Sequence, residues 1–270
     1  MYQPFISYKS MIIGRRGVKG DVMENTLESI LHSIDLGVDG IEIDIQRCYT
    51  GEIVLFHDET LDRLAFKDQF YFGNTINVPI SKLQWYHLYN TELIDSLGRK
   101  YKIPKLIDVL RHPKVYRSDI LINIEIKDYR SHESVADMIS ELVDEGLYDP
   151  GRFLISSYLT DPLIYFEEFK ADCLIKEQKY QNFKIGWIIE PDKLSEKDFL
   201  FSTKSYLKVL THVILDKDML NLSLIEKIKE MGLRIFVHTI NNKNEYPIDD
   251  IHNLVDGIIT DKPKNFICKN

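Results

Sequence analysis

Short apolar runs alternate with helical patterns of apolar residues along the whole chain. Eight runs have the length and composition of strands, and helical spacing appears between most of them. These predicted strands are Ser10–Gly14, Val38–Ile45, Ile120–Ile126, Phe153–Ser156, Lys184–Ile189, Thr211–Leu215, Leu233–His238 and Gly257–Thr260. Such alternation implies parallel strands joined by crossover helices. The count of eight, and the lack of a G-x-G-x-x-G after the first strand, favour an α/β fold with a closed (β/α)8 barrel over an open sheet.

Local signals place both ends of the first helix. Asn25 is predicted to cap the first helix, because Glu28 follows it at the spacing of a capping box. Gly37 is predicted to end that helix. A polar helix is predicted near Ser195–Ser205, between the fifth and sixth strands.

One segment breaks the rhythm after the second strand. A turn at Tyr49–Glu52 leads into Ile53–Phe56, which predicts a hairpin, and the long mixed stretch Leu61–Lys102 follows. We therefore expect a single domain over residues 1–270, with an excursion at about 46–102 above the barrel mouth. An aromatic cluster in the excursion is predicted to form a small core of its own, comprising Phe70, Tyr71, Phe72, Trp85 and Tyr86.

Composition narrows the classes of function. The chain is 44% hydrophobic with a net charge of −8, and no basic stripe indicates a nucleic-acid partner. Cys48, Cys173 and Cys268 are far apart and odd in number, so they form neither a disulfide framework nor a CxxC site. No apolar run approaches the ~20 residues of a transmembrane helix, and no signal-peptide pattern is present. We expect a cytoplasmic protein, and the sequence does not specify its oligomeric state.

Polar residues on two neighbouring predicted strands suggest a site. Glu42 and Asp44 share one face of their strand, since side chains alternate between faces. Asn123, Glu125 and Lys127 likewise share a face of the next strand. Three carboxylates should therefore converge at the barrel mouth. Either a hard cation with oxygen ligands neutralises them, or they form a salt-bridged set with Lys127.

A series of short motifs, in order along nearly the whole chain, resembles the glycerophosphodiester phosphodiesterase family. No single motif is decisive, but the ordered set is highly specific. The motifs are Arg16-Gly17, Glu24-Asn25-Thr26, Asp39-Gly40-Ile41-Glu42-Ile43-Asp44, Gly51-Glu52-Ile53-Val54, His57-Asp58, Ile103-Pro104-x-Leu106, Ile124-Glu125-Ile126-Lys127, Ser156-Ser157, Thr239-x-Asn241 and Asp256–Asp261 with Pro263. The resemblance implies a TIM barrel that hydrolyses phosphodiesters, such as glycerophosphocholine, with Ca²⁺ or Mg²⁺.

The resemblance also implies roles for individual residues. It makes the three carboxylates of Glu42, Asp44 and Glu125 the ligands of one divalent cation. Arg16 and Lys127 would contact phosphate oxygens of a small-molecule phosphodiester substrate. Glu24 would support Arg16 from the mouth of the barrel.

The chain departs from the family pattern at Arg15. The family has His-Arg-Gly after the first strand and uses two histidines as general acid and base, of which His57 remains. Arg15 stays protonated and cannot take a proton, although it can stabilise negative charge in the transition state. His238, where the family usually has Trp, is a second departure. It could restore proton transfer, although the eighth strand separates its strand from the first.

Three functions remain open at this point. The first is a metal-dependent hydrolase that releases an alcohol and glycerol 3-phosphate from glycerophosphodiesters. The second is a catalytically impaired relative that binds phosphodiesters or phosphate esters without efficient turnover, as Arg15 suggests. The third is a lyase that forms a cyclic phosphate, as phospholipase D toxins with the same type of barrel do; a first-strand histidine is expected there too.

Overall fold

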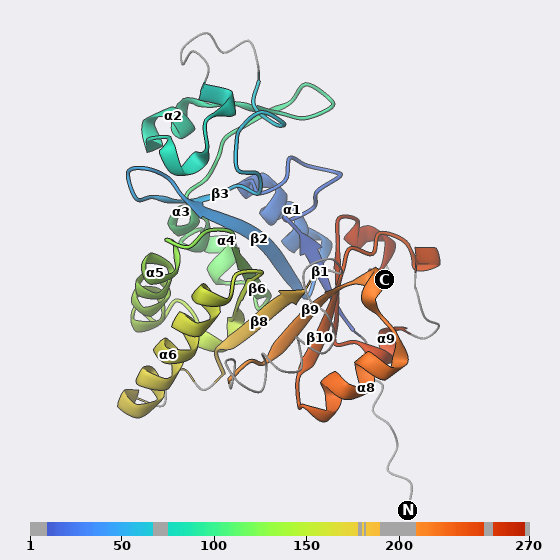
Figure 1. Cartoon of the computed structure of the whole chain (residues 1–270). Coiled ribbons are helices and arrows are strands. Elements are labelled where there is room, and N and C mark those ends of the chain that lie inside the picture. Colours follow the sequence, from blue (N-terminus) through green and yellow to red (C-terminus); the bar gives the residue numbers. More distant parts are fainter. Residues whose placement is uncertain are drawn as a thin grey trace, which may run out of the picture.

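A closed barrel of eight parallel strands forms the body of the protein (Figure 1). The computed structural model describes residues 10–66, 75–177, 180, 182–189, 209–245 and 251–267. The barrel strands are β1 (Met11–Arg15), β2 (Gly40–Arg47), β6 (Leu121–Ile126), β7 (Phe153–Ser157), β8 (Lys184–Ile189), β9 (His212–Asp216), β10 (Arg234–His238) and β11 (Gly257–Thr260). They pair in this order, and pairing of β1 with both β11 and β2 closes the ring. The predicted (β/α)8 barrel is confirmed, with each strand within two residues of its expected bounds.

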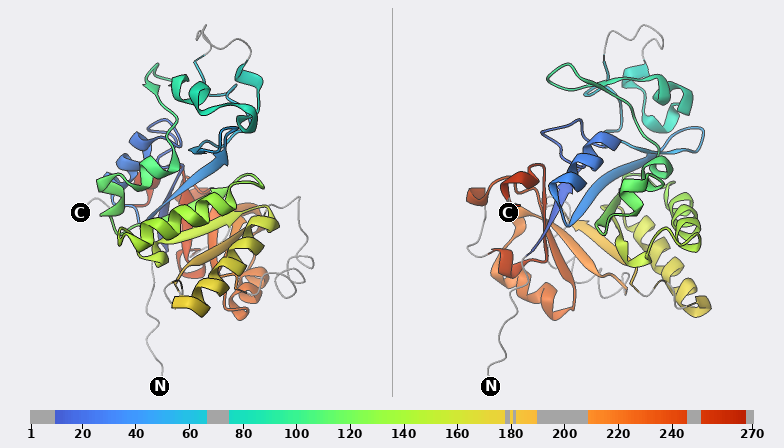
Figure 2. Two further views of the ribbon diagram at one scale, coloured as in Figure 1. Left: turned by 90° about the vertical axis from the view of Figure 1, so that its left-hand side faces the viewer. Right: turned by 180° about the vertical axis from the view of Figure 1, so that it is seen from behind.

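Helices connect the strands around the outside of the barrel (Figure 2). They are α1 (Leu27–Leu36), α3 (Leu106–Leu110), α4 (Pro113–Tyr116), α5 (His132–Asp144), α6 (Thr160–Glu177), α8 (Leu222–Glu230) and α9 (Ile251–Leu254). Single 3₁₀ turns occupy Pro150–Arg152, Lys217–Met219, Lys243–Glu245 and Pro263–Asn265. The helix predicted near Ser195–Ser205 lies outside the described residues. Within the described part of the chain, no helix is both long and apolar enough to cross a membrane.

Alternation of side chains along the strands creates two apolar layers. Outward-facing side chains such as Ile41, Ile43 and Ile124 are fully buried between the strands and the helices. A separate cluster fills the barrel interior, and it comprises Ile13, Leu121, Leu154, Ile188, Ile214, Phe236 and Ile259. Because these side chains exclude water from the lower barrel, polar side chains on the same faces collect at the carboxyl ends of the strands.

The first helix begins one residue later than expected. Thr26 is its N-cap, and the Thr26 hydroxyl accepts a hydrogen bond from the Ser29 amide at 3.2 Å. Asn25, predicted as the cap, has a left-handed backbone with φ of 55° and binds Asp44 instead. Gly37 ends the helix as predicted, with φ of 79°.

The excursion stands above one end of the barrel in each view (Figures 1 and 2). It starts with β3 (Ile53–Leu55), which pairs antiparallel with β2 as the hairpin prediction required. The later elements are 3₁₀ turns Thr75–Asn77 and Ile80–Lys82, helix α2 (Trp85–Asn90), and the paired strands β4 (Leu93–Ile94) and β5 (Lys100–Tyr101).

The excursion has a small core, which includes the predicted Trp85 but not the predicted Tyr86. Buried residues of this core include Phe56, Leu61, Ala65 and Leu88, and Trp85 packs against them. The expected member Tyr86 is 64% exposed, because it lies on the outer face of α2. Residues 70–72 lie outside the described residues.

Candidate active site

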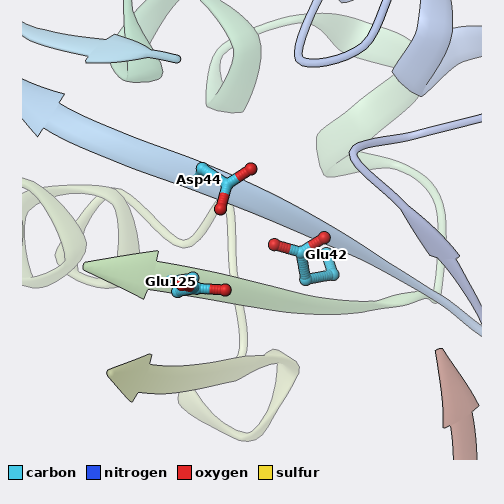
Figure 3. Close-up of side chains that lie close together, drawn as sticks. All are labelled: Glu42, Asp44 and Glu125. Atoms are coloured by element: carbon cyan, nitrogen blue, oxygen red, sulfur yellow. The ribbon is translucent and has the colours of Figure 1, made fainter. Parts of the chain in front are cut away.

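Three carboxylates meet at the carboxyl end of the barrel (Figure 3). Glu42 and Asp44 lie on β2, and Glu125 lies on the adjacent β6, where it is paired in register with Asp44. One oxygen from each residue lies within 4.8 Å of the others, and all three side chains are buried. The side-chain alternation predicted from the sequence therefore produces the expected cluster.

Two cations only partly neutralise this cluster. Lys127 Nζ lies 2.5 Å from Glu125 Oε1 and 3.4 Å from Asp44 Oδ1, while Arg16 Nε lies 3.0 Å from Asp44 Oδ2. Glu42 Oε2 accepts a hydrogen bond from the backbone amide of Arg16 at 3.0 Å. Glu42 Oε1 is buried and has no hydrogen-bond partner among the described residues. A hard divalent cation fits this set, because it would satisfy that oxygen and offset three acids.

The pKa values of the three acids separate according to their neighbours. Burial, with added repulsion from Asp44 and Glu125, raises the pKa of Glu42 to about 8. Burial also raises the pKa of Glu125, although Lys127 opposes this change. The pKa of Asp44 is lowered, because Lys127 and Arg16 outweigh the effect of burial. Without a further cation, burial therefore favours the protonated forms of Glu42 and Glu125 over that of Asp44.

Asn25 holds Asp44 from the side opposite Lys127. The Asn25 amide donates to Asp44 Oδ2 at 2.8 Å, and Asn25 Oδ1 accepts the Asp44 amide at 3.1 Å. The sequence motif contained Asn25, but helix-capping signals assigned it a different role. Its contact depends on how close the segment that precedes α1 lies to strand β2, which local sequence does not encode.

The turn after β1 adopts left-handed backbone at two consecutive residues. Arg16 has φ of 52° and Gly17 has φ of 81°. A Cβ on Gly17 would lie 2.4 Å from the Ser29 hydroxyl oxygen, so the turn packs directly on α1. This close packing turns the Arg16 amide toward Glu42.

Replacing Gly17 with alanine should destabilise the protein by more than the ~1–3 kcal/mol that left-handed backbone alone costs. The added Cβ would also clash with α1. Gly98 is a matched control, because its φ is 77° but no atom lies within 4 Å of the place that an added Cβ would occupy. Urea unfolding should show a larger loss for Gly17→Ala than for Gly98→Ala. Equal losses would contradict the close packing.

Arg16 and Glu24 form a buried pair next to Asp44. Arg16 Nη1 lies 2.8 Å from Glu24 Oε1. The family resemblance implied that Glu24 supports Arg16, and the structure brings these two side chains together. Arg16 also faces Asp44, so its first effect is to organise the acids. Its pKa is raised: burial alone would lower it, but Asp44, Glu24 and Glu42 outweigh that effect.

His57 follows the hairpin and is oriented by its neighbour. Its Nδ1 lies 2.7 Å from Asp58 Oδ1. The pKa of Asp58 is lowered, because hydrogen bonds from Arg63 and His57 outweigh burial. An ionised carboxylate only accepts hydrogen bonds, so Nδ1 carries the proton and Nε2 is the free acceptor of the neutral ring. Burial, with Lys127 and Arg16 adding to it, lowers the pKa of His57 and favours that neutral form.

A pocket opens beside the carboxylates and contains both residues that depart from the family pattern. Its walls are Arg15, Glu42, Asn123, Glu125, Tyr158, Ile188, Ile214, His238 and Ile259. The intervening β11 therefore does not keep His238 away from Arg15. Arg15 Nη1 lies 3.6 Å from Asp261 Oδ1, which follows β11. The pocket thus places one cation, Arg15, and His238 next to the acids Glu42 and Glu125, which gives it polar groups that can orient a ligand.

Sequence reasoning missed two further residues near the site. Tyr158 lies in the pocket wall, and Lys127 Nζ stands 5.2 Å from the centre of its ring. Arg63, in the excursion, contacts both Glu24 and Asp58. The available signal for Arg63 was its place five residues after Asp58 in the sequence. Arg63 lies, however, in a segment without regular periodicity.

Comparison with known proteins gives a consistent result. The sequence model of the glycerophosphoryl diester phosphodiesterase family matches residues 16–265. A glycerophosphodiester phosphodiesterase from Caldanaerobacter subterraneus subsp. tengcongensis is 27% identical over 272 residues, covering 96% of this chain and 97% of that protein. The solved glycerophosphodiester phosphodiesterase from Thermotoga maritima has a TM-score of 0.67 at 24% identity, and the match covers 96% of this chain and 97% of that chain. An Oleispira antarctica phosphodiesterase, solved with the product sn-glycerol-3-phosphate, has a TM-score of 0.70 at 18% identity. The match covers 96% of this chain and 95% of that chain.

Proposed function

The chain belongs to the glycerophosphoryl diester phosphodiesterase family, and we propose that it hydrolyses glycerophosphodiesters to an alcohol and glycerol 3-phosphate. The observation that carries this proposal is the meeting of Glu42, Asp44 and Glu125 at a pocket that Arg15 and His238 also line. The relative from Caldanaerobacter bears the name of this activity. The function predicted from the sequence agrees with this family membership.

Glu42, Asp44 and Glu125 would hold one divalent cation, Ca²⁺ or Mg²⁺. When bound, this cation would offset the negative charge of the acids and of the phosphate oxygens. Lys127 lies between Glu125 and Asp44 and presents its ammonium group near the same space. It would therefore contact a phosphate oxygen, and the Tyr158 ring limits the directions in which its side chain can move.

His57 would transfer the proton in this reaction. Asp58 would accept a hydrogen bond from the Nδ1–H group of His57, so Nε2 can receive a proton from the attacking group. The lowered pKa of His57 keeps the ring in its base-competent form near neutral pH. Arg15 would stabilise negative charge on the substrate, since guanidinium donates hydrogen bonds but does not release its proton. His238 shares the pocket with Arg15 and would contact the substrate there.

One observation favours a second candidate function, in which phosphodiesters are bound but not efficiently turned over. Arg15 stands where the family has a histidine, and its charge is directed toward Asp261. Loss of one general acid–base group typically lowers a rate by ~10²–10⁴-fold. Binding through the cation and Lys127 would survive that loss.

A turnover assay with glycerophosphocholine distinguishes these functions. We expect release of choline and glycerol 3-phosphate that requires Ca²⁺ or Mg²⁺ and stops with a chelator. Phosphorus NMR of the products would reveal a cyclic phosphate if the protein were a lyase. Saturable binding of glycerophosphocholine without any product would establish the second candidate instead.

Asp44→Asn should weaken the binding of a divalent cation, because it removes a charged oxygen ligand from the cluster. Loss of an outer-shell partner typically costs ~10–100-fold in metal affinity, and we expect at least that effect here. Calorimetric titration with Ca²⁺ and with Mg²⁺ measures it directly. Glu28→Gln, on the exposed face of α1, is the control that removes a carboxylate elsewhere. Absence of cation binding by the unaltered protein would refute the proposed metal site.

A further inference from the structure

An arginine of the excursion reaches back to the barrel and joins two parts of the site. Arg63 lies in the first turn of the excursion, between Leu61 and Ala65, which are both buried in the excursion core. These two anchors fix the backbone on either side of Arg63. The guanidinium of Arg63 is therefore presented to the barrel by a segment that has its own packed support.

The guanidinium binds two acids at once. Arg63 Nη2 and Nη1 donate to the two oxygens of Glu24 at 2.6 and 3.0 Å, a bidentate arrangement. Arg63 Nε donates to Asp58 Oδ2 at 2.5 Å. This geometry uses three of the five N–H donors of the planar group, and a lysine ammonium cannot reproduce it.

Each of these acids holds a different functional side chain. The second oxygen of Asp58 lies 2.7 Å from His57 Nδ1. Glu24 Oε1 lies 2.8 Å from Arg16 Nη1, and Arg16 in turn faces Asp44. An unbroken series of polar contacts thus runs from His57 through Arg63 to the acidic cluster.

We propose that Arg63 is a positioning residue that fixes Asp58 and thereby selects the ring orientation and tautomer of His57. The Asp58 side chain is one quarter exposed, so burial alone does not fix it, and its Oδ2 is bound by Arg63 Nε. With Oδ2 bound to Arg63, Oδ1 is held toward the His57 ring. The proton then stays on Nδ1, and Nε2 remains available as a proton acceptor. This inference rests on the proposed function only for its effect on turnover.

The matched control is Lys19, which also pairs with Glu24 but not with Asp58. Its Nζ lies 3.8 Å from Glu24 Oε2. Lys19→Ala therefore removes a cation from Glu24 and leaves the Asp58 contact intact. Arg63→Lys keeps a positive charge near both acids but loses the planar guanidinium that binds them together. Arg63→Ala removes the charge and the guanidinium.

The first measurement does not require turnover. Long-range ¹H–¹⁵N correlation spectra of protein with ¹⁵N-labelled histidine report which ring nitrogen carries the proton, and His57→Gln identifies the signal among the eight histidines. We expect protonated Nδ1 at His57 in the unaltered protein and in Lys19→Ala. We expect a mixture of tautomers in Arg63→Lys and Arg63→Ala. A His57 signal unchanged in both Arg63 variants would overturn the proposal.

The second measurement separates orientation from binding. With glycerophosphocholine and a divalent cation, kcat should fall by about 10- to 100-fold in both Arg63 variants while KM stays close to the unaltered value. Lys19→Ala should retain kcat. An equal fall of kcat in Lys19→Ala would overturn the proposal, because Glu24 rather than Asp58 would then carry the effect. If the unaltered protein has no turnover, the proposed function fails, and the NMR result still decides the role of Arg63.

Discussion

His57→Ala is expected to lower kcat on glycerophosphodiesters by about 10²- to 10⁴-fold, the usual effect of losing a general acid–base group. The ring has the features of a proton acceptor: Asp58 fixes Nδ1, and burial lowers its pKa. Arg16 and Lys127 near the acids cannot replace it, since Asp44 beside Arg16 and Glu125 beside Lys127 favour their charged forms. Steady-state kinetics at saturating cation measure the loss.

The same variant should retain its affinity for Ca²⁺ or Mg²⁺, because His57 is not one of the three clustered acids. His32→Ala is a matched control, since His32 lies on α1 outside the pocket. We expect that control to keep full activity. Full activity in His57→Ala would remove His57 from the mechanism and direct attention to His238.

Arg15→His is expected to raise turnover by about 10²-fold or more, if the second histidine of the family is required for an ordinary rate. Imidazole gains and loses a proton near neutral pH, whereas guanidinium does not. The sequence suggested that the charge of Arg16 would lower the pKa of the new histidine. The structure shows that Asp261 lies on the other side, 3.6 Å from Arg15 Nη1, and an acid there would raise that pKa. The new histidine would then serve as a general acid.

Arg15→Gln separates proton transfer from loss of charge. It should not raise turnover, because the amide neither accepts nor releases a proton. A rise of turnover in both variants would mean that the positive charge of Arg15 itself inhibits the reaction. If the unaltered protein turns over at an ordinary enzyme rate and Arg15→His lowers that rate, Arg15 is a working ligand of the substrate. His238→Ala would then test whether His238, in the same pocket, supplies the second proton.

The sequence by itself determined the barrel, because the signals for a barrel are local and repeated. Runs such as Lys184–Ile189 and Gly257–Thr260 coincide with β8 and β11. Alternation along β2 and β6 also placed Glu42, Asp44 and Glu125 on inward faces, since two-residue periodicity is a property of the strand itself. Motif order then indicated the family without any knowledge of distances.

Tertiary structure alone decided which groups complete the site. Asn25 has the sequence signals of a helix cap, yet its side chain binds Asp44, because a left-handed turn brings two distant segments together. Arg63 lies in an irregular segment, and only packing of the excursion core directs it to Asp58 and Glu24. Likewise, strand order suggested that β11 separates His238 from Arg15, whereas both side chains line one pocket in the closed barrel. Local periodicity specifies the face on which a side chain lies, but contacts between remote segments depend on how the whole chain packs.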